Sequence, residues 1–367
     1  MSTKKIRNVW GQICSFENLH TAYLHARKNK RYRNDVLAFS ANLEENLFDL
    51  QRQLLDHTYE VGHYREFYVY DPKKRLIMAL PFTDRVVQWA VYQVINPIYA
   101  SGYISDSFAC IDGRGTQQAI QRLHQWLKEV GRRPEKWYYL KLDVSKYFHR
   151  IDHARLIEIL RKKIKDNDLM WLLESIINCP DKAFGLPLNR SADQIAPENR
   201  LPDKGMPIGN LTSQMFANIY LDRLDQYCKR KLGIHYYIRY MDDVIILHDD
   251  KLQLGEYKRI IEKFLNEELL LDLNNKTALR PVTLGIEFVG YKLWNTHIKL
   301  KKASALKMKH RLRHLKKQYY RWEVDLPKIR KTLVSYNGVM KHCNCYNMRK
   351  KLYRGFVLKR GPKPIKE

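Results

Sequence analysis

Acidic residues are scarce in this sequence, and the imbalance is its first functional signal. The 367 residues include 39 Asp and Glu against 66 Lys and Arg, which gives a net charge of +27. Such an excess favours a polyanionic partner, because each phosphate neutralised by a Lys or Arg releases condensed counterions. The alternatives are a soluble protein with a charged surface and a protein that binds anionic lipid.

Long apolar runs are also missing. The most apolar stretch, residues 86 to 100, is interrupted by Gln88, Gln93 and Asn96, so it is not expected to span a bilayer. The charged N-terminus is not followed by the apolar segment of a secretion signal. We therefore expect a cytoplasmic protein with no membrane partner.

Cysteine and glycine do not form the clusters that mark several common sites. The six cysteines are scattered, which favours reduced thiols over a disulfide framework. Residues 342 to 345 read His-Cys-Asn-Cys, but no second Cys or His pair lies nearby in the sequence to complete a zinc site. The glycines of residues 113 to 116 are not followed by Gly-Lys-Ser/Thr, which excludes a Walker P-loop.

Basic charge is concentrated at one end of the chain. Residues 299 to 367 hold 22 Lys and Arg against 3 Asp and Glu, a net charge of +19. From residue 304 onward, apolar residues recur at spacings of four and three, which predicts a helix with one buried seam: Met308, Leu312, Leu315, Tyr319 and Trp322. The remaining faces are predicted to bind a template-primer duplex, with a solvated helix as the alternative. Their basic residues are Lys307, Lys309, Arg311, Arg313, Lys316 and Lys317.

The rest of the sequence mixes helical and strand patterns. Helical periodicity covers residues 18–60, 84–98, 116–129, 153–177, 212–232 and 256–270. Strand patterns cover residues 64–70, 75–80, 137–144, 236–240, 244–247 and 288–293. Thr116 is the expected N-cap of its helix, and residues 181 to 204 are expected to form an exposed loop.

Three aspartates are placed where two strands could bring them together. Asp143 ends one strand, while Asp242 and Asp243 occupy the tip of a predicted hairpin. If the strands are neighbours, the three carboxylates would raise one another's pKa unless a cation joined them. Hard oxygen ligands favour Mg²⁺, and two such ions support in-line phosphoryl transfer. At this point both a polymerase and a metal-dependent nuclease remain open.

Four segments resemble the motifs of reverse transcriptases, in the order that family has them. Tyr240-Met241-Asp242-Asp243 resembles the motif C hairpin, and Leu140-Lys141-Leu142-Asp143-Val144-Ser145-Lys146-Tyr147-Phe148 resembles motif A. Gly205-Met206-Pro207-Ile208-Gly209-Asn210-Leu211-Thr212-Ser213-Gln214 occupies the motif B position. Phe288-Val289-Gly290-Tyr291-Lys292-Leu293 resembles the primer grip, and the likeness extends over residues 20 to 350.

This resemblance implies a role for each matching residue. Asp143, Asp242 and Asp243 would bind two Mg²⁺ ions, or Mn²⁺ in their place, with the Val144 carbonyl as a further ligand. Lys276 would be the general acid for pyrophosphate. The residues implied to bind the incoming deoxynucleoside triphosphate (dNTP) are Lys74, Arg75, Phe148, Ile208 and Gly209. Those of the primer grip are Phe288, Val289, Gly290 and Tyr291.

Two of these roles have a simpler alternative. Phe148 matches the aromatic gate that excludes a ribose 2′-hydroxyl, and the alternative is a core aromatic residue. Lys74 and Arg75 match cations that hold the triphosphate, and the alternative is a surface turn.

Motif B is similar to that of reverse transcriptases from diversity-generating retroelements. Ile208 stands where many relatives have Gln, and Gln214 where they have Pro. In that family the enzyme copies a template-repeat RNA with frequent errors opposite adenine, in bacteria and phages, with a small basic oligomeric accessory protein as partner. Loss of the amide at position 208 would weaken discrimination by about 1 to 3 kcal/mol, the worth of one polar contact. The alternative is that Ile208 only packs beneath the templating base.

The resemblance implies an α+β right-hand polymerase fold with fingers, an antiparallel-sheet palm and a helical thumb. Residues 1–60 would form an N-terminal helical extension, 61–135 with 154–204 the fingers, 136–153 with 205–298 the palm, and 299–367 the thumb. Template RNA, the RNA/DNA hybrid and dNTPs are the expected partners. A retron, group II-like or phage-defence reverse transcriptase is the first alternative, and a non-catalytic RNA-binding or splicing cofactor the second.

Overall fold

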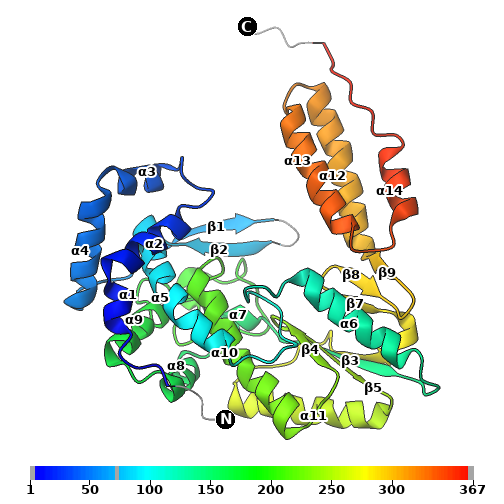
Figure 1. The fold of residues 1–367 in the computed structure, drawn as a ribbon, viewed down its shortest axis with the longest axis horizontal. Helices are drawn as coiled ribbons and strands as arrows, with labels where there is room; N and C mark the ends of the chain where they lie inside the picture. Colours follow the sequence, from blue (N-terminus) through cyan, green and yellow to red (C-terminus); the bar gives the residue numbers. More distant parts are fainter. Residues whose placement is uncertain (1–4, 71–73, 363–367) are drawn as a thin grey trace. The chain divides into compact units, whose positions relative to one another are not determined.

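A computed structural model describes residues 5–70 and 74–362 of the chain, which has mixed helices and antiparallel sheets (Figure 1). The α+β prediction is confirmed. The described residues group into two compact units. Unit 1 contains the chain up to Asp112 together with Leu142–Val244 and Glu256–Thr277, and unit 2 contains Gly113–Lys141, Ile245–Gly255 and the residues from Ala278 onward.

Unit 1 begins with helices packed around a long central one. The first four are α1 (Trp10–Cys14), α2 (Phe16–Ala26), α3 (Asn34–Ala41) and α4 (Leu43–Leu55). Helix α5 (Phe82–Ala100) packs along α2 and α10, and apolar side chains around most of its circumference are buried. This all-round burial matches the apolar pattern that predicted the helix.

A β-hairpin of unit 1 joins β1 (Arg65–Val69) to β2 (Arg75–Ala79) in antiparallel register, with Val69 opposite Arg75. The hairpin is anchored on one side only. Leu76 and Met78 are buried with Tyr64 and Phe184, whereas Arg75 is exposed. This alternation is the period-two burial of a strand that covers a core with one face.

Four more helices of unit 1 lie between residues 147 and 226 of the chain. They are α7 (Tyr147–Arg150), α8 (His153–Lys163), α9 (Asn167–Ile177) and α10 (Leu211–Gln226), followed by a π-helical turn, Tyr227–Lys231. Asp152 and Asp166 cap α8 and α9 by accepting hydrogen bonds from backbone N–H groups at 3.0 and 3.1 Å. Between α9 and α10, the loop contains a 3₁₀ turn, Pro197–Asn199, and an antiparallel bridge between Gly185 and Leu201.

A four-stranded sheet has the order β4-β5-β3-β6. Its strands are β3 (Tyr138–Asp143), β4 (Tyr237–Tyr240), β5 (Asp243–His248) and β6 (Ala278–Pro281). The division between the units runs through β3 and β5, so each of these strands belongs partly to both. Helix α11 (Lys251–Glu268) follows β5 in the chain.

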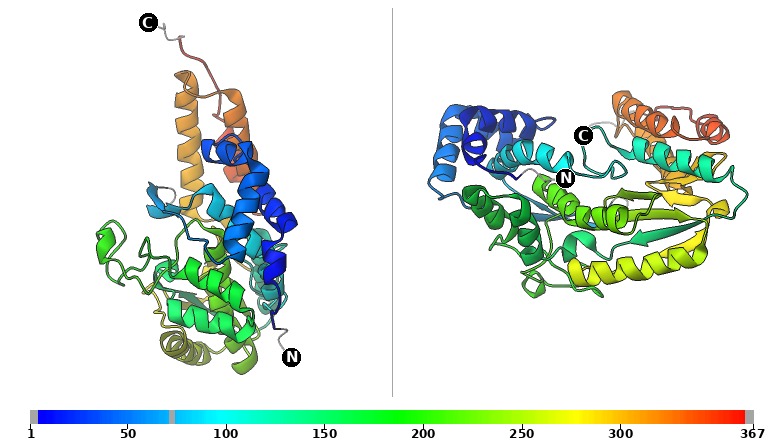
Figure 2. Two further views of the ribbon diagram at one scale, coloured as in Figure 1. Left: turned by 90° about the vertical axis from the view of Figure 1, so that its left-hand side faces the viewer. Right: turned by 60° about the horizontal axis from the view of Figure 1, so that its bottom comes forward.

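Unit 2 contains α6 (Thr116–Val130), a three-stranded sheet and three C-terminal helices. The strands are β7 (Ile286–Phe288), β8 (Tyr291–Leu293) and β9 (Ile298–Leu300), and the helices are α12 (Lys302–Tyr320), α13 (Leu326–Met340) and α14 (Tyr346–Tyr353). Figure 2 shows α12 and α13 side by side. Leu312 and Leu315 of the predicted seam are buried between the helices.

The structure corrects two local predictions in unit 2. Gly115 rather than Thr116 is the N-cap of α6, and its N–H donates to the side chain of Gln118 at 3.0 Å. Residues 288 to 293 form a hairpin rather than one strand, because Val289 and Gly290 take positive φ values of 40° and 88°. An extended strand cannot continue through two such residues.

Over the described ranges, no helix combines the length and the apolar character that crossing a bilayer requires.

Candidate active site

The hairpin β4–β5 carries two of the predicted catalytic aspartates at its tip. Ile238 on β4 and Val244 and Ile245 on β5 are buried, so apolar packing holds both strands. Met241 has a φ of 56°, an unusual value for a residue other than glycine, and this conformation turns the chain within two residues. Asp242 therefore lies in the turn itself, and Asp243 begins β5.

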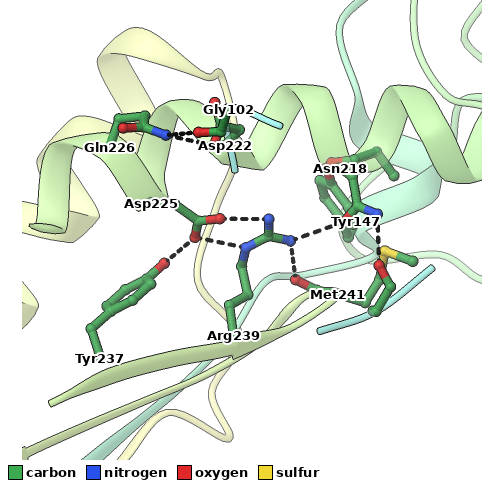
Figure 3. A network of polar contacts seen from close by, with 11 residues as sticks. Gly102, Tyr147, Asn218, Asp222, Asp225, Gln226, Tyr237, Arg239 and Met241 are labelled. Carbon is green, nitrogen blue, oxygen red and sulfur yellow. Dashed lines mark hydrogen bonds and ion pairs between the residues drawn. The ribbon is translucent and has the colours of Figure 1, made fainter. Parts of the chain in front are cut away.

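A buried ion pair between Arg239 and Asp225 supports this turn (Figure 3). Arg239 donates two hydrogen bonds to Asp225 of α10, at 2.7 and 2.6 Å, and both side chains are fully buried. Tyr237 donates a third hydrogen bond to Asp225 at 2.6 Å. Burial opposes the charge of Arg239, but the charge and hydrogen bonds of Asp225 more than offset this and raise the pKa of Arg239. The guanidinium is thus a permanently charged group inside the fold.

Arg239 also bonds to the backbone of the Met241 turn and to that of residues 106–108. Its Nη1 donates to the Met241 carbonyl at 2.9 Å, which fixes the strained residue next to Asp242. Its own N–H and C=O bond to Asp106 and Phe108 at 3.0 and 3.1 Å, so residues 106–108 pair with β4. Sequence analysis missed this network. The signal was a charged residue inside the apolar strand Tyr237–Tyr240, since such residues are rarely buried without a partner.

Asp143, the third predicted aspartate, ends β3 where the chain is paired with residues 272–274. Asn274 donates to the Asp143 carbonyl at 2.7 Å, and Ser145 donates to the Asp272 carbonyl at 2.8 Å. In this antiparallel bridge, Val144 lies opposite Leu273 and its neighbours make the hydrogen bonds. The Val144 carbonyl therefore points to the side of the strand away from Leu273.

Asp143 and Asp242 interact electrostatically. Burial raises the pKa of Asp242 above its usual value, and the negative charge of Asp143 raises it further. Arg75 and Arg239 act in the opposite direction by lowering it. Two carboxylates from distant parts of the sequence thus share one electrostatic environment with the predicted triphosphate-binding Arg75.

The oxygen atoms at this place suit a divalent cation. Two carboxylates and the Val144 carbonyl are hard donors of the kind that Mg²⁺ prefers. Across residues 5–70 and 74–362, no group of three or more His, Cys, Asp or Glu side chains is arranged to hold a metal ion. Asp143, Asp242 and Asp243 do not form such a group, so their role as metal ligands stays a prediction.

The predicted nucleotide-binding residues come from three segments that are hydrogen-bonded to one another. Met78 of β2 donates to the Ile208 carbonyl at 3.2 Å, and Met206 donates to the Phe148 carbonyl at 2.6 Å. The approach at Gly209 is close, because an added Cβ would lie 3.2 Å from the Ile77 side chain. Gly209 also has a φ of 120°, which favours glycine. The loop before α10 is thereby tied both to the β1–β2 hairpin and to the Phe148 segment.

Lys74, the other predicted triphosphate ligand, already has an anionic neighbour. Its Nζ lies 3.0 Å from a carboxylate oxygen of Asp193 and 4.6 Å from the centre of the Tyr68 ring. Because this ion pair is exposed, it adds little stability, and a triphosphate could replace the carboxylate.

Lys276, the predicted general acid, is exposed in a turn that begins at Asn274. Its N–H donates to the Asn274 side chain at 3.1 Å. Since the Asn274 N–H is bonded to Asp143, Lys276 is only two residues from the backbone contact that holds this aspartate.

The predicted primer grip and basic helix belong to unit 2. The turn at Val289 and Gly290 is attached to α12, because Lys301 donates its N–H to the Gly290 carbonyl at 3.0 Å. Tyr291 donates its hydroxyl to the Val339 carbonyl of α13 at 2.9 Å. All six basic residues predicted to contact a duplex are exposed on α12: Lys307, Lys309, Arg311, Arg313, Lys316 and Lys317.

The chain matches a known family over most of these segments. The family described as "Reverse transcriptase (RNA-dependent DNA polymerase)" matches residues 70–293, which include both predicted catalytic strands and the motif B loop. This range is more than half of the chain.

The individual proteins that match this chain share only a small part of its sequence. "Protein YkfC" of Escherichia coli (strain K12) is 26% identical over 284 residues, covering 66% of this chain and 71% of that protein. "Group II intron-encoded protein LtrA" of Lactococcus lactis subsp. cremoris is 26% identical over 247 residues, covering 65% of this chain but only 38% of that protein. Telomerase from Candida albicans, solved with a fragment of telomeric RNA, is 14% identical with a TM-score of 0.47, covering 81% of this chain and 56% of that chain.

Proposed function

Because the chain belongs to the reverse transcriptase family, we propose that it is an RNA-directed DNA polymerase with Asp143, Asp242 and Asp243 as its catalytic carboxylates. The observation that carries the proposal is the electrostatic link between Asp143 and Asp242 next to Arg75. A polymerase needs anionic metal ligands and a cation for the triphosphate at one place. Here they come from a hairpin tip, a strand end and the β2 strand.

Divalent cations are the cofactor that this donor set fits. Asp143, Asp242 and the Val144 carbonyl would hold Mg²⁺, with Asp243 beside them and Mn²⁺ as a substitute. Two such ions would supply Lewis-acid chemistry, lowering the pKa of the primer 3′-hydroxyl and stabilising the leaving pyrophosphate. The protein keeps the aspartates in position through the Met241 turn and the Arg239–Asp225 pair.

The remaining site residues bind and select the nucleotide. Arg75 and Lys74 attract the triphosphate, and Phe148 excludes a ribose 2′-hydroxyl by occupying the space it needs. Ile208 presents only an apolar surface to the nascent pair. Lys276 protonates the leaving pyrophosphate, a role that suits an exposed amine.

The nucleic acid would be held by the exposed cations of α12 and by the turn at Val289 and Gly290. Six basic side chains on one helix provide phosphate contacts without base specificity. We propose that the duplex is an RNA/DNA hybrid made from a template-repeat RNA.

The sequence of motif B places the enzyme among diversity-generating retroelements in this proposal. Ile208 and Gln214 support the assignment. The proposal includes frequent errors opposite adenine. A small basic oligomeric accessory protein would dock on the basic thumb or on the N-terminal helices. If co-purification with the product of a neighbouring gene fails at moderate salt, this partner is excluded.

Splicing assistance is a second candidate, because a relative is named for a group II intron. A cofactor of this kind binds intron RNA and needs no polymerase chemistry. The present chain spans 38% of that relative's length. Its activity therefore has to be measured on this chain itself.

Primer extension on an RNA template with dNTPs separates these functions. We expect the wild-type chain to extend the primer and Asp242→Ala to lose about a thousandfold or more in rate, because the metal ligand is removed. Asp203→Ala, which changes an exposed aspartate outside the site, is the matched control and should extend normally. RNA binding without extension by the wild type would favour the splicing cofactor, and degradation of the template would favour a nuclease.

A further inference from the structure

Asn210 occupies the N-cap position of α10, but its side chain does not cap the helix. Asparagine is a preferred N-cap residue, because its side-chain oxygen accepts a hydrogen bond from a backbone N–H of the first turn. At Asn210 no such bond forms. Its side-chain nitrogen instead donates to the hydroxyl of Tyr64 at 3.0 Å, across 146 positions of the chain. The side chain thus makes a distant contact in place of a local one that is worth about 1 kcal/mol.

Tyr64 is held firmly where the chain enters the β1–β2 hairpin. It is 5% exposed and lies in the apolar cluster that anchors the hairpin, with its ring centre 5.2 Å from that of Phe184. Its N–H donates to a carboxylate oxygen of Asp181 at 3.0 Å. Both the ring and the backbone are therefore fixed, and the hydroxyl offers Asn210 an acceptor at a defined place.

The bond to Tyr64 restrains the turn that carries Ile208. Ile208 and Gly209 directly precede Asn210, and the Ile208 carbonyl accepts from the Met78 N–H at 3.2 Å. The turn is therefore attached at two points, through a backbone bond at Ile208 and a side-chain bond at Asn210. One bond would leave the turn free to pivot, whereas two bonds set its orientation.

Tyr64 is also connected to the segment that carries Phe148. The contact runs through Phe184, whose carbonyl accepts a hydrogen bond from Nδ1 of His149 at 3.1 Å. His149 directly follows Phe148 in the chain. Tyr64 thus bonds to the segment of Ile208 and packs against the residue that holds the segment of Phe148.

We infer that Tyr64 and Asn210 are a positioning pair, whose hydrogen bond sets the Ile208 turn against the Phe148 segment and so sharpens selection of the incoming nucleotide. The inference rests on the proposed polymerase function, in which Ile208 faces the nascent base pair and Phe148 faces the sugar. Neither member of the pair is proposed to touch the nucleotide. Without their bond the turn should stay folded but lose its fixed orientation, so selection should suffer more than stability.

Hydrogen exchange of the full chain tests the restraint without any catalysis. Tyr64→Phe keeps the ring in its apolar cluster and removes only the acceptor. The Met78 N–H, followed in peptides of β2, should then exchange about tenfold faster, because the Ile208 turn to which it is bonded is released. The melting temperature should fall by no more than about 2 °C, since the freed Asn210 side chain can cap α10. Unchanged exchange at Met78 would overturn the inference.

Incorporation of a deoxynucleotide against the matching ribonucleotide measures selection. Tyr64→Phe should lower the ratio of the two kcat/KM values by about fivefold or more, mainly through a higher KM for the deoxynucleotide. Asn210→Ser can still cap α10 but is too short to reach Tyr64, so it should lower the ratio equally. The double variant should lower it no further, because both changes remove the same bond.

Tyr59→Phe is the matched control for a lost tyrosine bond. Tyr59 is also 5% exposed, and its hydroxyl donates to Asp84 at 2.5 Å. This variant should be less stable than wild type but select nucleotides normally. If Tyr64→Phe lowered kcat/KM for both nucleotides alike, the pair would be purely structural and the inference would be wrong. A wild-type chain that incorporated neither nucleotide would defeat the polymerase proposal, and exchange at Met78 would still decide whether the pair holds the turn.

Discussion

Arg239 in unit 1 and the basic residues of α12 in unit 2 carry the same charge in opposite environments. Arg239 is fully buried and makes two hydrogen bonds to one carboxylate. The six cations of α12 are exposed. A buried charge must be fully paired to be tolerated, and its pairing fixes the position of the backbone around it. An exposed charge costs little and fixes nothing, but it attracts a polyanion from solution.

The comparison assigns each kind of charge a separate purpose. The buried pair holds the Met241 turn and so positions Asp242, which makes it part of the catalytic geometry without contacting substrate. The α12 cations are proposed to supply affinity for nucleic acid. Mutations in the first region should therefore affect stability and rate, and mutations in the second should affect binding and its salt dependence.

The largest effect on stability is expected from removing Arg239. Arg239→Met leaves Asp225 buried and unpaired, so unfolding free energy should fall by about 3 to 5 kcal/mol, measured by urea denaturation. Primer extension should fall as well, because the Met241 carbonyl loses its donor.

A double variant provides the control for that prediction. Arg239→Met/Asp225→Leu removes both charges and should recover much of the lost stability, but not the activity, because the turn is still unsupported. If the single variant were as stable as wild type, the claim that a paired buried charge fixes the turn would be wrong.

On the exposed side, the expected effect is on binding alone. The triple variant Lys309→Ala/Arg313→Ala/Lys316→Ala should bind an RNA/DNA duplex more weakly and reduce the slope of log K against log salt by roughly 3, or about 0.9 for each lost phosphate contact. Its melting temperature should stay within about 2 °C of wild type. Fluorescence anisotropy over a salt series measures the duplex affinity and the salt slope, and thermal denaturation measures the melting temperature.

A matched set on the next helix tests whether position matters. Lys328→Ala/Arg330→Ala/Lys331→Ala on α13 removes the same charge, also from exposed residues. If this variant lost as much duplex affinity as the α12 variant, only net charge would matter, and the predicted duplex-binding face would be abandoned.

A smaller effect is expected at Ile208, which we propose to face the nascent base pair. Ile208→Gln restores an amide that can hydrogen-bond there, so misincorporation opposite adenine should fall by about fivefold or more, for a contact worth about 1 to 3 kcal/mol. Single-nucleotide extension on an RNA template measures the error frequency. Ile208→Leu keeps the apolar surface and should behave like wild type. Unchanged errors in the Gln variant would show that Ile208 only packs.

The smallest effect concerns Asp222, which lies one turn of α10 before the paired Asp225. Burial raises the pKa of Asp222 to about 6, and the charge of Asp225 contributes, while Gln226, Arg239 and Arg223 oppose the rise. The folded state therefore binds this proton more readily than the unfolded chain, and Asp222 destabilises the fold less as pH falls from 7 through 6.

Asp222→Asn isolates this contribution. The melting temperature of the variant should exceed that of wild type at pH 7, and the difference should shrink toward pH 5. A difference that did not change with pH would mean that Asp222 has an ordinary pKa. Lys163 of α8 is attracted to the charged form of Asp222, so the measured difference includes the loss of this attraction.

The sequence predicted best those site features that are formed by one short stretch of the chain. The hairpin around Asp242, the strand ending at Asp143 and the basic α12 each follow from periodicity or charge within about twenty residues. The turn at Gly290 also had a local signal, the glycine itself. The apolar residues around it nevertheless led to the prediction of one continuous strand.

Contacts between distant segments could not be read from the sequence, because even the local signal at Arg239, a charged residue in an apolar strand, does not identify its partner. The pairing of Arg239 with Asp225, of Asn274 with Asp143 and of Met78 with Ile208 depends on how helices and strands pack. The bond between Asn210 and Tyr64 depends in the same way on segments that come together only in the fold.

Binding of Mn²⁺ to the unliganded protein, followed by isothermal titration, tests most directly whether Asp143 and Asp242 share a cation. We expect saturable binding to wild type and a loss of about tenfold or more in affinity for both Asp143→Asn and Asp242→Asn, with Asp203→Asn unchanged. If the two variants bound Mn²⁺ as tightly as wild type, the two carboxylates would not form the catalytic metal site.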